Sequence, residues 1–401
     1  MRANLWKLKL LRTFFWMFFF SSVLIPFFTE WGHLKLSQVF FLNAWFMFWN
    51  FALEVPTGTV ADRFGRKASL VIGSAVSGLA SVLYVSRPAF AVFLAAEVLF
   101  AVAYTLHSGA DEALAYDSLM VLGRENEAKK TLAAMESFKL GGIIFATIAG
   151  GWIASLFGYD APMRAYAAPA AIAVLISLTL KEAPRISGEK EIRPYFSILR
   201  EGARYFAGHK TLLLLTLELA VTNAMAWTII WLFQPALAKG GLAIKYYGLV
   251  HAAACVGQIL FLTRVEKAES WAGSKSRVLK ASAFALALGF AVLGAASYRL
   301  TGWANLCVTI PAVVVTFASG LSRVPIFSSY MNAHIPSEKR ATVLSFVSMC
   351  RTFAIVVVSP AVGMVADRSL TWAFFGLSAA VAVVTLFSRI EERHLQEENR
   401  P

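Results

Sequence analysis

The sequence predicts an all-α membrane protein whose twelve transmembrane helices form two pseudo-symmetric six-helix bundles. The first observation is composition: 58% of the 401 residues are hydrophobic and 15% are charged, whereas soluble domains are about half apolar and about a quarter charged. The second is that apolar runs repeatedly approach the roughly 20 residues that a helix needs to cross a bilayer. The third is that basic residues gather in short clusters between those runs, as in cytoplasmic loops.

Apolar runs bounded by charged or turn residues place the helices along the chain. In the first half we expect spans at 12–31, 37–57, 68–86, 89–119, 132–156 and 162–180. In the second half we expect spans at 211–236, 245–264, 279–298, 303–330, 341–362 and 370–389. An even number of spans places both termini on one side of the membrane.

The amino terminus resembles a secretory signal, because four basic residues precede an apolar run from Thr13 to Phe28. A signal peptide would need small residues at a cleavage site after that run. Thr29, Glu30 and Trp31 follow instead. We therefore expect the run to be retained as the first transmembrane helix.

The distribution of lysine and arginine sets the expected topology. Of these 37 residues, 27 fall in the terminal segments, the central segment and every second loop, and seven fall in the alternate loops. The remaining three lie within expected spans: Lys139, Arg323 and Arg351. By the positive-inside rule, both termini are expected in the cytoplasm of a multi-pass inner (cytoplasmic) membrane protein. This placement, rather than a nucleic-acid partner, accounts for the net charge of +13.

The longest polar stretch divides the chain almost in half and sets the expected domains. We expect an amino-terminal bundle at 1–180, a cytoplasmic linker at 181–210, and a carboxy-terminal bundle with a cytoplasmic tail at 211–401. Aromatic and aliphatic residues alternate with Arg200 and Arg204 in the linker. This alternation predicts an amphipathic helix on the anionic cytoplasmic leaflet, with a simple solvated linker as the alternative.

The two halves are weakly repeated. A shift of 211 residues aligns Thr131 with Thr342 and sets Glu112 opposite Arg323. Two related half-bundles are a recurring architecture of transporters.

The sharpest motif follows the second expected span and runs from Gly58 to Lys67. It reads Gly58-Thr-Val-Ala-Asp62-Arg63-Phe-Gly65-Arg66-Lys67. Glycine permits a tight turn, and the basic residues hold the loop at the cytoplasmic face. The spacing resembles the G-x-x-x-D-R-x-G-R-K signature of the major facilitator superfamily, with every key position filled. A generic basic loop would explain the composition but not the spacing.

This resemblance implies a gate at the cytoplasmic face. Asp62 and Arg66 would form a charge relay that latches the two halves in the outward-open state. Asp117, within the span expected at 89–119, is expected to belong to the same gate and to meet the basic loop.

Two further stretches resemble a bacterial subgroup of the superfamily known largely as exporters of lipophilic compounds. They are Glu54-Val-Pro56-Thr-Gly58 and Asp111-Glu112-Ala-Leu-Ala-Tyr116-Asp117-Ser118. The sequence departs from many proton-coupled drug exporters at two points. No lysine or arginine lies between Arg87 and Arg124, and the span at 132–156 has no Gly-Pro motif. That span instead has four glycines suited to close helix packing, namely Gly141, Gly142, Gly150 and Gly151.

Ionisable residues within membrane helices usually face a cavity or a partner. At 100° per residue, one face of the span at 89–119 would carry Glu97, Tyr104, Ser108, Asp111 and Ala115, flanked by His107 and Glu112. We interpret this face as an acidic site for substrate or protons. The alternative is that these acids pair structurally with Arg323, Arg351 or Lys139.

The second half offers further central polar groups, which are Glu218, Asn223 and Arg323. A lone amide in a membrane helix is more often an interhelical hydrogen bond than a ligand. Glu218 is the stronger candidate for proton coupling, because a membrane carboxylate without a partner would be protonated part of the time.

Other classes of function have little support in the sequence. The six histidines are scattered, and no zinc-binding pair, phosphate loop or nucleophile elbow is present. We therefore expect no metal, no cofactor and no enzymatic activity, and a membrane enzyme is the alternative of another class. A channel would need a pore loop or repeated filter, which is missing. Cys255, Cys307 and Cys350 are expected to be free, buried thiols.

The sequence therefore predicts a secondary transporter that moves a small amphipathic molecule, cationic or neutral, by alternating access. Proton-coupled export is the preferred form, and an importer of nutrients or metabolites is the alternative within the same superfamily. The expected partners are the substrate, protons and the lipid bilayer, and a monomer is expected.

Overall fold

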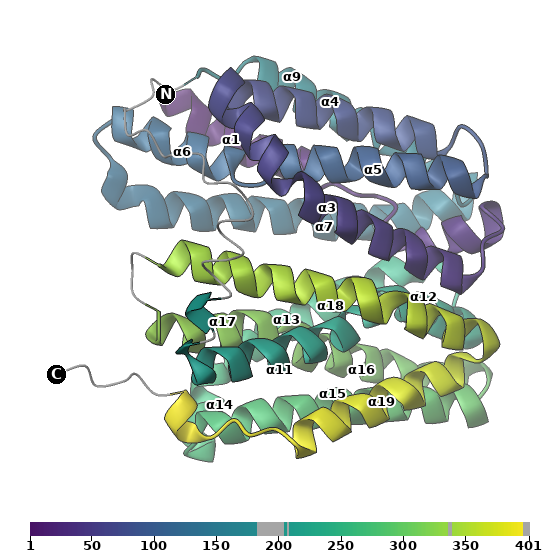
Figure 1. Ribbon diagram of the computed structural model, residues 1–401. Helices are drawn as coiled ribbons and strands as arrows, with labels where there is room; N and C mark the ends of the chain where they lie inside the picture. Colours follow the sequence, from purple (N-terminus) through teal and green to yellow (C-terminus); the bar gives the residue numbers. More distant parts are fainter. Residues whose placement is uncertain (183–203, 207, 336–338, 396–401) are drawn as a thin grey trace. The chain divides into compact units, whose positions relative to one another are not determined.

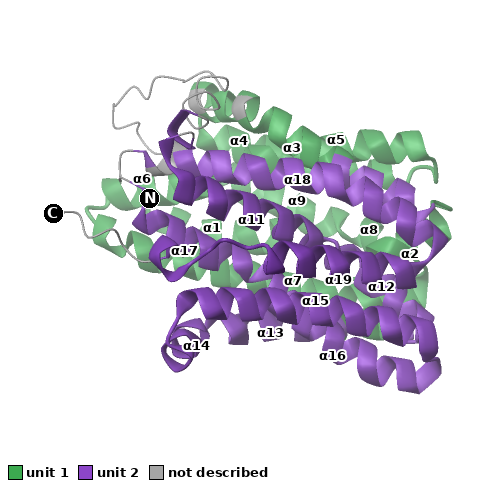
Figure 2. Cartoon of the chain, turned by 60° about the horizontal axis from the view of Figure 1, so that its bottom comes forward, with its two compact units in different colours: residues 1–34, 45–192, 244–249 green, residues 35–44, 193–243, 250–401 purple. Residues whose placement is uncertain are grey.

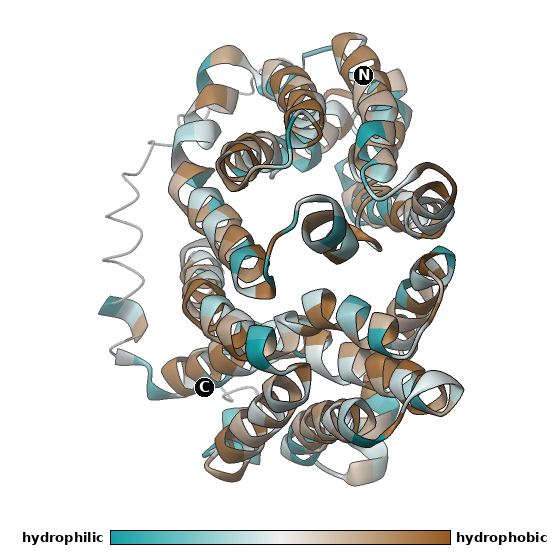
Figure 3. Ribbon diagram, turned by 90° about the vertical axis from the view of Figure 1, so that its right-hand side faces the viewer, coloured by the Kyte–Doolittle hydropathy of each residue, from teal (hydrophilic) through white to brown (hydrophobic). Residues whose placement is uncertain are grey.

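A computed structural model describes residues 1–182, 204–206, 208–335 and 339–395 (Figure 1). Helices account for nearly all of the regular structure, and the described residues form no strand. Ten helices in this part of the chain are long and apolar enough to cross a membrane, and Leu370–Leu386 is a shorter apolar helix. Hydrophobic residues dominate most of these helices in Figure 3. The predicted all-α membrane fold is confirmed.

The chain forms two compact units, which are coloured separately in Figure 2. Unit 1 consists of residues 1–34, 45–192 and 244–249, and unit 2 consists of residues 35–44, 193–243 and 250–401. Residues 35–44 and 244–249 thus belong to a different unit from the residues on both sides of them. The predicted amphipathic helix of the linker falls largely on 183–203, outside the described residues.

Unit 1 is built from helices of very different length. Its elements are α1 (Arg2–Phe15), α2 (Leu24–Pro26), a π-helical turn (Phe27–Trp31), most of α3 (Leu36–Phe64), α4 (Arg66–Tyr84), α5 (Phe90–His107), α6 (Ala110–Val121), α7 (Ala128–Phe157), α8 (Ala161–Ala165) and α9 (Ala167–Leu178). The helix α4 packs against both α5 and α9, and α1 packs against α7.

The first expected span is wrong as a single helix over 12–31. Instead, α1 begins at Arg2 and ends at Phe15, and residues 16–23 are not helical before α2 begins. Close approach to α7 accompanies this break. A Cβ at Gly142 would lie 2.7 Å from the carbonyl oxygen of Thr13, and one at Gly150 would overlap the carbonyl oxygen of Phe19. Gly150 therefore admits the non-helical backbone at Phe19, and Gly142 admits the last turn of α1, where larger residues would exclude both.

Unit 2 contains the helices of the second half. They are α11 (Lys210–Trp227), α12 (Ile229–Lys239), most of α13 (Tyr247–Leu262), α14 (Val265–Ala272), α15 (Lys275–Arg299), α16 (Gly302–Leu321), α17 (Arg323–Ala333), α18 (Arg340–Arg368) and α19 (Leu370–Leu386). Helix α15 packs closely against α19, and α11 packs closely against α18. Leu215, Leu219, Phe327 and Met331 are fully buried in the core near the start of α11.

Four further expected spans are interrupted. The span at 89–119 divides into α5 and α6 at Ser108 and Gly109, and the span at 162–180 divides into α8 and α9 at Tyr166. The spans at 211–236 and 303–330 are interrupted at Thr228 and Ser322. Irregular backbone within membrane helices is a recurring property of transporter binding sites. The cysteines are free as expected, but none is fully buried: Cys307 is exposed on α16, and Cys255 and Cys350 are partly buried.

Candidate functional site

The break between α5 and α6 places an acidic pair at a helix start. Gly109 has a left-handed conformation, with φ 76° and ψ −25°, which glycine adopts without steric cost. The first turn of α6 then carries Asp111 and Glu112. Negative side chains are favoured there by the helix dipole.

Arg12 of α1 contacts three carboxylates in unit 1. Its Nε lies 2.7 Å from Asp111 Oδ2, its Nη2 lies 2.6 Å from Glu112 Oε1, and its Nη1 lies 3.5 Å from Glu136 Oε2 on α7. Lys139 Nζ also lies 3.0 Å from Glu136 Oε1. The site therefore holds three carboxylates and two cations.

The three acids differ in their access to solvent. The side chain of Asp111 is 7% exposed, whereas those of Glu112 and Glu136 are about half exposed. Asp111 is thus positioned for a fixed ion pair with Arg12, and Glu112 is accessible to a ligand.

Aromatic rings flank this acidic cluster. Lys139 Nζ lies 4.4 Å from the centre of the Trp16 ring, and Trp16 packs edge-on against Tyr104 with a centroid separation of 5.6 Å. Tyr104 is 39% exposed. The arrangement can therefore offer both a carboxylate and an aromatic surface to an amphipathic molecule.

The predicted single face along residues 97–115 is wrong, because the helix is broken within it. Glu97 of α5 is buried and forms a hydrogen bond with Tyr84 of α4. His107 is also buried, with Nε2 lying 3.0 Å from Ser74 Oγ and its ring stacked on Phe15. These contacts place both residues in the packing of unit 1 rather than among the carboxylates that contact Arg12.

The signature loop is shorter than the sequence suggested. The helix α3 continues through Gly58 and Arg63 to Phe64, so that Gly65 alone separates it from α4. Gly65 has φ 97°, which other residues rarely adopt. The carboxylate of Glu182 accepts hydrogen bonds from the backbone N–H groups of Arg66 and Lys67, at 2.9 and 2.8 Å. This acid satisfies N–H groups that a helix start leaves without partners.

Arg66 and Asp117 form an ion pair between α4 and α6. Arg66 Nη1 also donates to the carbonyl oxygen of Ala113. The expected meeting of Asp117 with the basic loop is therefore present in the structure. The side chain of Asp62, the other residue of the predicted relay, lies outside what the structure describes.

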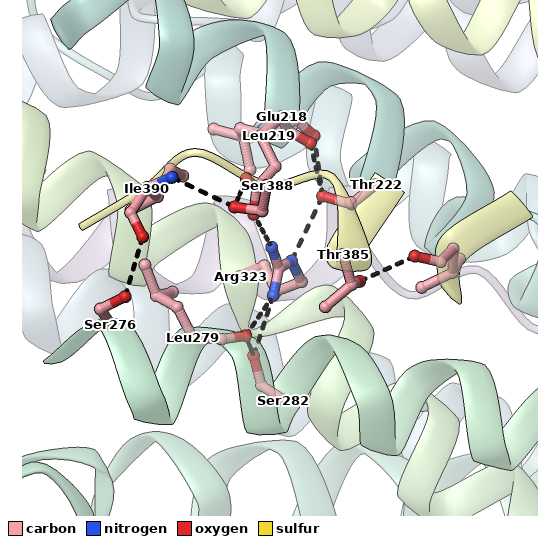
Figure 4. Close-up of polar contacts among 11 residues, drawn as sticks. Glu218, Leu219, Thr222, Ser276, Leu279, Ser282, Arg323, Thr385, Ser388 and Ile390 are labelled. Carbon is pink, nitrogen blue, oxygen red and sulfur yellow. Dashed lines mark hydrogen bonds and ion pairs between the residues drawn. The ribbon is translucent and has the colours of Figure 1, made fainter. Parts of the chain in front are cut away.

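Unit 2 holds a second buried ion pair, shown in Figure 4. Arg323 at the start of α17 is fully buried, and its Nη2 donates to Glu218 Oε1 of α11 at 3.0 Å. The other donors of the guanidinium reach Thr222 Oγ1, Ser282 Oγ and the carbonyl oxygen of Leu279, at 2.9–3.2 Å. Ser388 donates to the second oxygen of Glu218. Both charges are thus paired and extensively hydrogen-bonded.

The two ion pairs have opposite polarity in the two halves. In unit 1 the cation, Arg12, is on the first expected helix and the acids are on the fourth. In unit 2 the acid, Glu218, is on the first expected helix and the cation, Arg323, is on the fourth. This exchange agrees with the alignment of Glu112 on Arg323 in the sequence repeat.

Asn223, the remaining candidate, is a hydrogen-bond acceptor within unit 2. Arg351 Nε of α18 donates to Asn223 Oδ1 at 3.1 Å, and Asn223 is 1% exposed. This contact is the interhelical role expected of a lone amide.

Three residues of these sites escaped sequence reasoning. Arg12 was counted among the cytoplasmic charges, and Glu136 and Glu182 were not singled out. The available signal was position, since Arg12 directly precedes the apolar run and Glu136 lies three residues before Lys139 in one expected helix.

Comparison with known proteins identifies similar chains. A family model described as Major Facilitator Superfamily matches residues 10–359. The uncharacterized MFS-type transporter YxaM of Bacillus subtilis (strain 168) is 23% identical over 338 residues, which cover 83% of this chain and 80% of that protein.

Solved structures show the same fold. The nucleoside transporter NupG has a TM-score of 0.77 and 15% identity, covering 96% of this chain and 97% of that one. A D-xylose-proton symporter has a TM-score of 0.73 and 13% identity, covering 97% and 99% of the two chains. At these identities the likeness concerns the fold alone.

Proposed function

This chain belongs to the Major Facilitator Superfamily, and from that premise we propose that it is a proton-coupled exporter of a small amphipathic molecule, cationic or neutral. It is a multi-pass membrane transporter of that superfamily. The proposal adds the direction, the coupling ion and the class of substrate. It also places both termini in the cytoplasm and takes the active form as a monomer.

The charge imbalance around Arg12 is the observation that carries the proposal. Asp111, Glu112 and Glu136 share only Arg12 and Lys139 as cations among the ion pairs of the described residues. One carboxylate is therefore in excess. In a membrane environment an excess charge is costly, so that it favours uptake of a proton or of a cationic group.

Competition for this excess carboxylate would couple the two movements. Glu112 is the exposed member, so we assign it the exchange of a proton for substrate. Trp16 and Tyr104 would contact the apolar part of the substrate. Binding of one ligand then requires release of the other, which is the basis of antiport.

The Glu218–Arg323 pair is assigned a different role. Its cation is fully buried at the start of α17 and is hydrogen-bonded to residues of both α11 and α15. We therefore propose that this pair holds unit 2 together rather than exchanging protons. The Arg66–Asp117 pair, together with Asp62, is assigned to the gate that the family signature implies.

Export is preferred because of the two sequence stretches that resemble the exporter subgroup. The second stretch, from Asp111 to Ser118, contains both the acids that contact Arg12 and the aspartate that contacts Arg66.

The test is substrate flux in proteoliposomes with an imposed pH gradient. Candidate cationic and neutral amphipathic compounds would be compared for wild type, Glu112→Gln, Asp111→Asn and Glu218→Gln, with Glu125→Gln as a control for an exposed acid in the loop after α6. We expect Glu112→Gln to abolish the response to the gradient and Glu125→Gln to leave it unchanged. Wild-type flux that ignores the gradient would refute proton coupling. A normal response in Glu112→Gln would refute the choice of carboxylate.

A further inference from the structure

The segment after α19 is joined to unit 2 by an ordered set of hydrogen bonds. The carboxylate of Glu392 accepts from Ser274 Oγ and from the backbone N–H groups of Lys275 and Ser276, at the start of α15. Ser276 Oγ donates to the carbonyl oxygen of Ile390 at 2.9 Å. Residues 388–394 therefore form a built surface of unit 2.

A depression of about 560 Å³ lies between this segment and the adjacent helix starts. Its lining is mostly basic and consists of Lys210, Thr211, Leu214, Lys280, Ser388, Arg389, Glu391, Arg393 and His394. The helices α11 and α15 thus contribute a lysine each, and the segment after α19 contributes two arginines.

Three of these cations form no ion pair with a carboxylate of the described residues, namely Lys210, Lys280 and Arg389. The lining acid, Glu391, already pairs with Arg393, with Nε lying 2.9 Å from Oε2. His394 Nδ1 accepts a hydrogen bond from the backbone of Glu391, so its remaining ring N–H is at Nε2. The depression therefore presents donors and positive charge, which suit a phosphate group.

Large apolar side chains lie beside these cations in the sequence. Leu386 is 70% exposed and Phe387 is 79% exposed, directly before Ser388 and Arg389. Exposed apolar residues next to a cluster of cations suit a molecule that has both acyl chains and a charged headgroup. A free phosphate would use the cations but not this apolar surface.

We propose that this depression binds the phosphate headgroup of an anionic phospholipid. Lys210, Lys280 and Arg389 contact the phosphate, and Leu386 and Phe387 lie against the acyl chains. Ser388 connects the site to the membrane interior, because it lines the depression and also donates to Glu218. The site is independent of the substrate and coupling ion proposed above.

The test is retention of fluorescent phosphatidylglycerol by the purified full-length protein in detergent. We compare wild type with the triple variant Lys210→Gln, Lys280→Gln and Arg389→Gln. A matched triple control, Arg264→Gln, Lys267→Gln and Arg277→Gln, removes the same charge from exposed positions around α14. Since each basic residue near an anionic surface contributes about 1 kcal/mol, we expect the first variant to bind about a hundredfold more weakly. The control should bind as wild type does.

Two further measurements complete the test. Displacement of the probe distinguishes binding of lipid from binding of free phosphate, and a charge-preserving variant distinguishes loss of binding from loss of folding. Phosphatidylcholine and inorganic phosphate should fail to displace the probe, whereas unlabelled phosphatidylglycerol should displace it. The charge-preserving variant Lys210→Arg, Lys280→Arg and Arg389→Lys should retain binding. Equal binding by the first triple variant, equal loss in the control, or displacement by inorganic phosphate would each overturn the proposal.

Discussion

Arg12 lies 2.7 Å from Asp111, and the same guanidinium reaches Glu112 and Glu136. One side chain of α1 thus joins α6 and α7. Removing it would leave three carboxylates to repel one another, with Lys139 as the remaining cation.

We expect Arg12→Gln to lower the free energy of unfolding by about 3–5 kcal/mol, as breakage of a buried pair does. Adding Asp111→Asn should restore part of this loss, because it removes the carboxylate left in a buried position. Thermal unfolding in detergent measures both. If the double variant is less stable than Arg12→Gln alone, the pair does not carry the expected coupling.

The buried pair of unit 2 gives a second stability prediction. Arg323→Met should destabilise the protein by about 3–5 kcal/mol, because Glu218 would stay buried as an unpaired charge. The double variant with Glu218→Gln should recover most of that stability. Chemical unfolding of the three variants checks this, with Arg264→Gln as a solvent-exposed control. Equal stability of Arg323→Met and wild type would contradict the assigned role.

The gate prediction concerns transport rather than stability. Asp117→Asn and Asp62→Asn should each depress transport while leaving the protein folded and inserted. Coupling free energies between conformational states are about 1–3 kcal/mol, which shift populations by about tenfold or more. Flux in proteoliposomes and unfolding temperature are measured together. Unchanged flux in both variants would remove this contact from the mechanism.

Gly109 lies at the break between α5 and α6, and Gly141, within α7, serves as its matched control. A Cβ at either position would meet no atom within 4 Å, but Gly109 has φ 76° and Gly141 is helical. Gly109→Ala should therefore cost about 1–2 kcal/mol through backbone strain, whereas Gly141→Ala should add about 1 kcal/mol of stability. Unfolding measurements that find the same sign for both would argue against the left-handed turn.

Glu392 gives a pH prediction outside the membrane-spanning segments. Burial alone would raise the pKa of Glu392, but hydrogen bonds from Ser274 and the backbone of Ser276 and Lys275 outweigh it and hold that pKa below its ordinary value. This contribution to stability is present above the ordinary value of about 4.3 and is lost as the pH falls through the folded-state pKa. The free energy of unfolding should therefore decline less steeply in acid for Glu392→Gln than for wild type. If the free energy of unfolding fell equally steeply with pH in both proteins, this role of Glu392 would be contradicted.

The sequence identified the helices because each needs a long apolar run, which composition alone reveals. It could not identify the breaks, since Gly109 and Gly141 both lie within expected spans and only the fold distinguishes their backbones. Arg12 was missed for a related reason. The apolar run begins at Thr13, so Arg12 appeared to flank the helix, whereas α1 begins at Arg2 and buries Leu8 and Leu11.

Glu218 and Arg323 were predicted only in part from the sequence. Each was recognised as a costly charge within the membrane, but Arg323 was offered as a partner only for the acids of the span at 89–119, and Glu218 was treated as a carboxylate without a partner. Predicting their pairing required knowing that α11 and α17 lie side by side, which a sequence repeat suggests only weakly.

The contact of Glu182 with the start of α4 has a consequence for the chain that directly follows α9. Helix α9 ends at Leu178, yet the chain is fastened again at Glu182, beside Gly65. Residues 179–182 therefore belong mechanically to the signature turn. Removing any of these four residues would pull directly on the turn that orients Arg66.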